Sequence, residues 1–109
     1  MMKLAIYPNI KVKLGGLGMK VCGSKFHLNS LPPNSDQLCD HWKPWFYEAI
    51  ELFGVERCMF ESNFPVDRMS LSYRVYYNAM KKLVAGASEA EKTALFMGTA
   101  ASVYRLTLP

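Results

Sequence analysis

The segment FGVERCMFESNFPVD, residues 53–67, is the part of the sequence from which the fold is deduced. Its apolar centre, Arg57 to Phe60, is bounded by Gly54 before it and by the turn residues Ser62 to Pro65 after it. An apolar run this short is typical of a buried strand and not of a helix. We therefore expect a strand over 57–60, with polar residues directly after its carboxyl end.

A first strand is expected over Ile10–Leu14, where apolar and basic residues alternate until the glycines that follow Leu14. Between the two strands, apolar residues recur at three- and four-residue spacing from Asp36 to Phe53, which predicts an amphipathic helix with Ser35 as its N-cap. Pro44 lies inside this helix and predicts a kink or a division into two helices. Two strands separated by such a helix must be parallel if they pair.

Three further helices are expected downstream, which gives the chain an α/β order of strand, helix, strand and then helices. The segment from Met19 to Asn34 has no periodicity and is expected to be a loop. The expected helices begin at Ser70 or Ser72 and end at Gly86, begin at a Ser88–Glu91 capping box and end before Gly98, and begin at Thr99 and run through Leu106.

Composition excludes several classes of protein. The 109 residues are 50% hydrophobic and 20% charged, as in one small globular domain. No apolar stretch approaches the ~20 residues of a membrane span, and the N-terminus does not resemble a secretory signal. We therefore expect a cytoplasmic protein without membrane contact.

Charge distribution and cysteine spacing argue against a nucleic-acid site and a zinc site. The formal net charge of +4 is scattered along the chain, which argues against a nucleic-acid site. The three cysteines, Cys22, Cys39 and Cys58, have no zinc-like spacing and are expected to be reduced, partly buried thiols.

Several segments resemble the C-terminal part of the amidohydrolase-2 family of metal-dependent hydrolases. They are Pro8–Gly18, Trp42–Pro44, Phe53–Asp67 and, as the closing helix, Gly98–Leu106. Members of that family are TIM barrels, and a full barrel needs about 250 residues. The resemblance therefore implies a partial barrel: the last two βα units, with two parallel strands, plus C-terminal helices. Residues 1–109 are expected to be a single domain, a C-terminal fragment of a (β/α)8 barrel.

The resemblance also implies a chemistry, the hydrolysis of an ester, lactone or amide by water activated on a divalent metal, Zn or Mn. The HxH strand and the later histidines that hold the metal in the family have no counterpart in this sequence, and His27 and His41 match no ligand motif. We therefore expect no metal site in this chain and no activity from it alone. An upstream barrel segment would have to supply the ligands.

Asn63 is the candidate catalytic residue. In the family, an aspartate just after the eighth strand contacts the metal-bound water and moves its proton, and Asn63 stands at the matching position. An amide has no titratable carboxylate, so Asn63 can position water or substrate but cannot act as a general base. Glu61 and Asp67 are candidate substrate-binding residues at the same strand end. A turn without function is the alternative, in which Asp67 caps the helix that follows.

Lys13 is the third candidate for substrate binding. Strand alternation puts Lys11 and Lys13 on one face and Val12 and Leu14 on the other. A lysine near the end of a barrel strand would be costly unless it faced the site. The alternative is an exposed residue of an edge strand.

The second interpretation of the chain is a non-catalytic α/β fragment that oligomerises or serves as an interaction module. Two parallel strands and a few helices are expected to leave Val12, Leu14, Met59 or Phe60 poorly covered, which would favour a homo-oligomer. Its interface would use the strand edges or a face formed by Trp42, Trp45 and Phe46.

Overall fold

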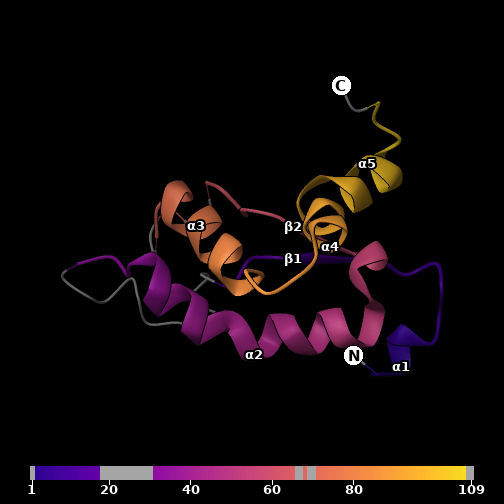
Figure 1. The fold of residues 1–109 in the computed structure, drawn as a ribbon, viewed down its shortest axis with the longest axis horizontal. Helices are drawn as coiled ribbons and strands as arrows, with labels where there is room; N and C mark the ends of the chain where they lie inside the picture. The colour runs from indigo at the N-terminus through magenta and orange to yellow at the C-terminus, as the bar shows by residue number, and fades with distance from the viewer. Residues whose placement is uncertain (1, 18–30, 66–67, 69–70, 108–109) are drawn as a thin grey trace. The chain divides into compact units, whose positions relative to one another are not determined.

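The structure is a computed structural model, and it describes residues 2–17, 31–65, 68 and 71–107 (Figure 1). Among these residues, no helix is both long enough and apolar enough to cross a membrane. The elements in chain order are α1 (Met2–Ala5), β1 (Val12–Leu14), α2 (Ser35–Phe53), the 3-10 helix η3 (Val55–Arg57), β2 (Cys58–Phe60), α3 (Tyr73–Leu83), α4 (Glu89–Thr93), the π-helical turn η5 (Ala94–Gly98) and α5 (Thr99–Tyr104).

The chain forms two compact units. The strand unit contains Met1–Leu14, Trp45–Phe60 and Ala87–Pro109, and the loop unit contains Gly15–Pro44 and Glu61–Gly86. Each unit has its own buried side chains and is described by itself below.

The strand unit is built on the pairing of β1 with β2. The two strands are parallel, as predicted, with Val12 opposite Cys58, Lys13 opposite Met59 and Leu14 opposite Phe60. They are shorter than the predicted strands, because the residues before Val12 lie outside the ladder and Val55–Arg57 form a 3-10 turn.

Helices cover these strands, so the expectation of poorly covered strand residues is wrong for Leu14, Met59 and Phe60. Their exposed fractions are 3%, 3% and 8%, while Val12 is half-buried. The Phe60 ring lies 6.3 Å from that of Phe46 on α2 and 4.9 Å from that of Phe96 on η5. Both helices thus bring aromatic side chains to β2, and the apolar strand surface is removed from water within the unit.

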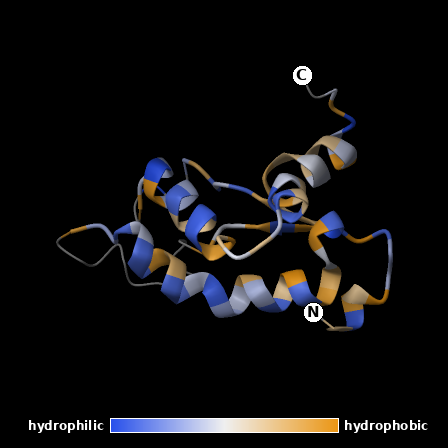
Figure 2. Cartoon of the chain, in the orientation of Figure 1, coloured by the Kyte–Doolittle hydropathy of each residue, from blue (hydrophilic) through white to orange (hydrophobic). Residues whose placement is uncertain are grey.

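α2 confirms the predicted helix but corrects two of its details. It is one helix through Pro44, so of the two predicted alternatives the division into two helices is wrong. Proline removes one backbone donor, but Trp42 before it and Phe46 after it are both buried, and their burial outweighs one missing hydrogen bond. Figure 2 shows hydrophilic and hydrophobic residues alternating along α2, as expected for a half-buried helix.

The N-cap of α2 is Asn34, not Ser35. The Gln37 N–H donates to Asn34 Oδ1 at 2.8 Å, and the Asn34 N–H donates to Gln37 Oε1 at 3.0 Å. This reciprocal pair has the geometry of a capping box. Ser35 instead accepts a hydrogen bond from Lys82 Nζ at 2.7 Å, and the same ammonium bonds Asp36 at 2.7 Å.

The later helices confirm two predicted caps and correct a third. Ser72 caps α3, and Ser88 with Glu91 forms the capping box of α4. Gly98 does not end a helix, and Thr99 does not cap one, because the helical backbone continues through both residues. Thr99 is buried, and its hydroxyl donates to the Val55 carbonyl at 2.7 Å, which links α5 to the turn before β2.

The described cysteines are free and buried, as expected of Cys39 and Cys58, while Cys22 and His27 lie outside the described residues. Burial raises the pKa of the Cys58 thiol from 9.0 to about 11, against a smaller opposing effect of Arg57. The Cys58 thiol lies 3.7 Å from the Ala49 carbonyl oxygen. Cys58 is therefore a protonated packing residue of the strand unit at neutral pH and not a nucleophile.

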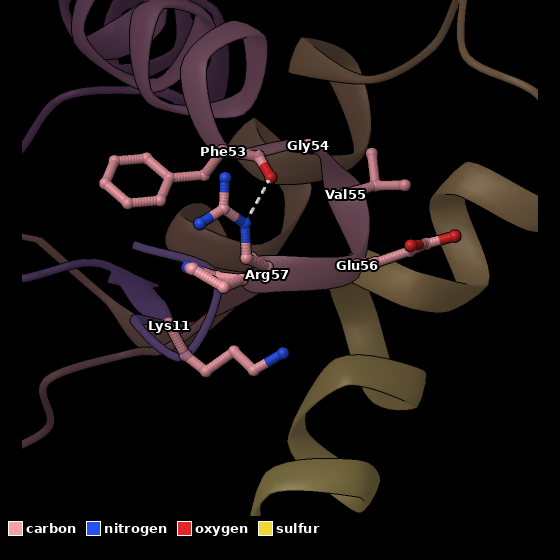
Figure 3. Close-up of a pocket in the computed structure, with 7 residues that line it drawn as sticks. Lys11, Phe53, Gly54, Val55, Glu56 and Arg57 are labelled. Carbon is pink, nitrogen blue, oxygen red and sulfur yellow. Dashed lines mark hydrogen bonds between the residues drawn. The ribbon is translucent and has the colours of Figure 1, made fainter. Parts of the chain in front are cut away.

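Arg57 joins three parts of the strand unit through main-chain carbonyls, and Figure 3 shows its bond to Phe53. Nε donates to Phe53 at 2.9 Å, Nη1 to Tyr7 at 2.9 Å and Nη2 to Ala5 at 3.0 Å. The guanidinium also lies 5.0 Å from the centre of the Phe53 ring. Phe53 and Arg57 also line an open pocket of about 470 Å³, together with Pro8, Lys11 and Gly54–Glu56. Because the guanidinium donates to three carbonyls, we assign Arg57 a structural role.

We predict that Arg57→Lys lowers the free energy of unfolding by about 1.5–3 kcal/mol, because an ammonium cannot reach three carbonyls held in fork geometry. Urea unfolding followed by circular dichroism measures the change. The matched control is Arg74→Lys on the exposed side of α3, which is expected to change stability by less than about 0.5 kcal/mol. Equal effects of the two substitutions would contradict the assignment.

Candidate functional site

The residues after β2 form a turn in the loop unit. Glu61, Ser62, Asn63 and Phe64 are all half-buried, and the Ser62 hydroxyl oxygen accepts a hydrogen bond from the Phe64 N–H at 3.3 Å. Asn63, at the centre of the turn, has a φ of 54°, in the left-handed region. Asparagine tolerates this region better than most residues, so the backbone here favours the residue that is present.

A glycine after β1 lies directly against this turn. A Cβ added to Gly15 would overlap the main-chain carbonyl oxygen and the Cγ of Glu61. Gly16, next to it, has a φ of 82°, which only glycine adopts without strain. Gly15 and Gly16, which follow the end of β1, thus also permit the segment after β1 to approach the segment after β2.

Three tyrosines of α3 complete the surroundings of the turn. The Tyr73 ring lies 5.5 Å from the Phe64 ring and 4.8 Å from the Tyr77 ring, and Tyr77 lies 4.9 Å from Tyr76. Tyr76 in turn meets buried Trp42 at 5.9 Å. An unbroken series of aromatic contacts therefore runs from the core of the loop unit to the residue after Asn63.

Tyr77 has a perturbed pKa. Burial raises the pKa of its hydroxyl above the ordinary value of 10.0, and the neighbouring Tyr73 and the Glu61 carboxylate raise it further. Hydrogen bonding to Ser62 acts in the opposite direction. The Tyr77 hydroxyl is consequently neutral at physiological pH and is available as a hydrogen-bond partner.

Of the three tyrosines, only Tyr76 is fully buried. Tyr73 is 56% exposed and Tyr77 is half-buried. A signal was present in the sequence, since residues 73 and 77 are one helical turn apart and follow closely after the turn that carries Asn63.

The structure describes three of the four candidate residues. Glu61 and Asn63 share the turn after β2, whereas Lys13 belongs to the strand unit, opposite Met59 in the ladder. Its side chain is exposed and alternates with buried Leu14, as predicted from the pattern. Asp67 lies outside the described residues.

The described part of the chain does not fit a resident metal ion. Among residues 2–17, 31–65, 68 and 71–107, no group of three or more histidine, cysteine, aspartate or glutamate side chains could hold one. His41 is an exposed residue of α2. In the turn after β2, Ser62 and Asn63 offer hydrogen-bonding groups and Glu61 offers one carboxylate, which can bind and orient a polar substrate.

Comparison with known proteins defines the class. The family model described as "Amidohydrolase" matches residues 1–106. This chain therefore belongs to the amidohydrolase family, which confirms the resemblance seen in the sequence.

Two relatives show how much of a family member is present. The uncharacterized protein y4mH of Sinorhizobium fredii is 41% identical over 106 residues, which are 97% of this chain and 31% of that protein. A zinc-bound crystal structure of an amidohydrolase from Burkholderia multivorans is matched with a TM-score of 0.80 and 29% identity, over 97% of this chain and 35% of that one. A crystal structure of an amidohydrolase from the same organism with bound HEPES gives the same values. The chain thus spans about a third of the length of the relatives it matches, and its fold class, α/β and part of a TIM barrel, is confirmed.

We predict that Gly15→Ala lowers the free energy of unfolding by about 1–3 kcal/mol, because the methyl group collides with the main chain of Glu61. Gly86→Ala is the control, since nothing lies within 4 Å of a Cβ at that position. Urea unfolding measures both variants, and a Gly15→Ala variant as stable as the control would contradict the close approach.

Proposed function

We propose that this chain is the C-terminal segment of a metal-dependent hydrolase that cleaves the C–O or C–N bond of an ester, a lactone or an amide. The observation that carries the proposal is the position of Asn63, directly after β2 in a member of the amidohydrolase family. Zinc in the Burkholderia neighbour supports the use of a divalent metal, Zn or Mn, in the complete fold. The ligands would come from an upstream barrel segment.

In the proposed hydrolase, the residues of this chain bind the substrate and orient it. The Asn63 amide can donate a hydrogen bond to a carbonyl oxygen of the substrate or accept one from a water molecule, but it cannot take up a proton at neutral pH. Glu61, Asp67 and Lys13 are proposed as substrate-binding residues on a small-molecule substrate. We expect the isolated chain to be inactive, since the described residues hold no metal site.

A chimera tests the proposal, in which this chain replaces the matched third of the Burkholderia amidohydrolase. We predict that Asn63→Asp changes the rate of hydrolysis more than Asp67→Asn does, by on the order of 10²-fold, because a carboxylate at position 63 can act as a general base. Rates on a panel of esters, lactones and amides are compared at equal zinc content, which is measured by elemental analysis. Equal or smaller effects at position 63 would count against the role of Asn63.

A non-catalytic homo-oligomer is the second candidate, and exposed apolar side chains of the strand unit favour it. Met2, Ile6 and Trp45 are 72%, 73% and 59% exposed. The interface expected from Trp42, Trp45 and Phe46 together is wrong, because Trp42 and Phe46 are buried and only Trp45 reaches the surface. Large exposed apolar side chains favour association in water.

Light scattering on the purified 109-residue chain tests this second candidate. We predict a metal-free dimer or larger oligomer at micromolar concentration, and we predict that Trp45→Ser shifts it toward the monomer. Tyr104→Ser, which replaces another exposed aromatic residue of the strand unit, is the control. A stable, well-folded wild-type monomer would refute the oligomer.

A further inference from the structure

The two residues that flank Asn63 in the chain both contact side chains of α3. Before it, Ser62 hydrogen-bonds with Tyr77, and after it, the Phe64 ring contacts the Tyr73 ring edge to face at 5.5 Å. Tyr73 and Tyr77 are one helical turn apart and contact each other at 4.8 Å. Two neighbouring side chains of one helix thus hold the two residues that flank Asn63.

The hydroxyl groups form an ordered series. Ser62 Oγ accepts from the Phe64 N–H, so its own proton is available to donate to the Tyr77 oxygen. The Tyr77 hydroxyl is hydrogen-bonded with both Ser62 and Tyr73. Hydrogen bonds therefore connect the Phe64 N–H, Ser62, Tyr77 and Tyr73 in that order, and neighbouring bonds polarise one another.

Packing restricts movement of the Tyr77 side chain away from these hydrogen bonds. It is half-buried, and it lies between Tyr73 and Tyr76, whose ring meets buried Trp42. On the other side of the turn, the close contact of Gly15 with Glu61 limits movement of the main chain. A turn held from both sides can keep Asn63 in its left-handed conformation, which costs free energy for a residue other than glycine.

We infer that Tyr77 is a positioning residue for Asn63: through the Ser62 hydroxyl, it fixes the turn that presents the Asn63 amide to the substrate. The inference rests on the proposed function for its purpose, but not for its geometry. Tyr73 supports the same turn, since it hydrogen-bonds with Tyr77 and its ring contacts the Phe64 ring.

The test compares Tyr77→Phe with Tyr47→Phe in the full 109-residue chain. The first variant removes the hydroxyl but keeps the ring, and the second removes a hydroxyl from an exposed tyrosine of the strand unit. Nuclear magnetic resonance measures hydrogen exchange of the Phe64 N–H and the shifts of the Asn63 side-chain amide. In Tyr77→Phe we expect about tenfold faster exchange at Phe64 and displaced Asn63 amide signals, with unchanged exchange at Met80 in the core of α3.

A pH titration separates positioning from simple packing. In the wild type, the Ser62 and Asn63 signals should show an inflection above pH 10, where Tyr77 ionises, with Glu61 and Tyr73 as the charged and titratable groups beside it. That inflection should be lost in Tyr77→Phe and displaced to higher pH in Ser62→Ala, which removes the donor to the phenolate. Unchanged Asn63 signals and Phe64 exchange in Tyr77→Phe would overturn the inference and leave the proposed hydrolase untouched. The opposite outcome is also informative. If the Asn63 and Phe64 signals depend on Tyr77 but Asn63→Asp leaves the hydrolysis rate of the chimera unchanged, the proposed function is refuted and the link between Tyr77 and the turn stands.

Discussion

The parallel pairing of β1 with β2 is the constraint on which the strand unit depends. Only three residue pairs form the ladder, and a two-stranded parallel sheet is not stable without cover on its faces. The cover comes from α2 and η5, whose Phe46 and Phe96 meet Phe60. The pairing also determines the direction in which both strands end, so the glycines after β1 and the turn after β2 follow the same end of the ladder.

Local sequence signals predicted the elements well where one interaction dominates. The alternation in Ile10–Leu14 and the short run Arg57–Phe60 identified both strands, and Ser88 with Glu91 identified a capping box. Prediction failed where two residues compete for one role. Asn34 and Ser35 are both good caps, and Gln37, three residues after Asn34, decides between them. Gly98 and Thr99 suggested a helix boundary, but the Thr99 hydroxyl finds the Val55 carbonyl and helical geometry persists.

The candidate site shows the same division. Asn63 and its turn were visible in the sequence, because Ser-Asn-Phe-Pro after an apolar run is local information. The part played by Tyr77 was not, since its hydroxyl acts on a residue fifteen positions earlier in the chain. A tyrosine on the apolar face of a helix is ordinarily read as core, and only the contacts reveal that its polar end meets a turn.

The contacts of Arg57 have a consequence for how the sequence can diverge. Its guanidinium binds the main-chain carbonyls of Ala5, Tyr7 and Phe53, and a carbonyl is the same group in every residue. Substitutions at positions 5 and 7 therefore leave the acceptors in place, while a substitution at position 57 removes all three bonds together. The amino-terminal segment can therefore change in side-chain identity without losing these bonds, provided that its backbone path and Arg57 persist.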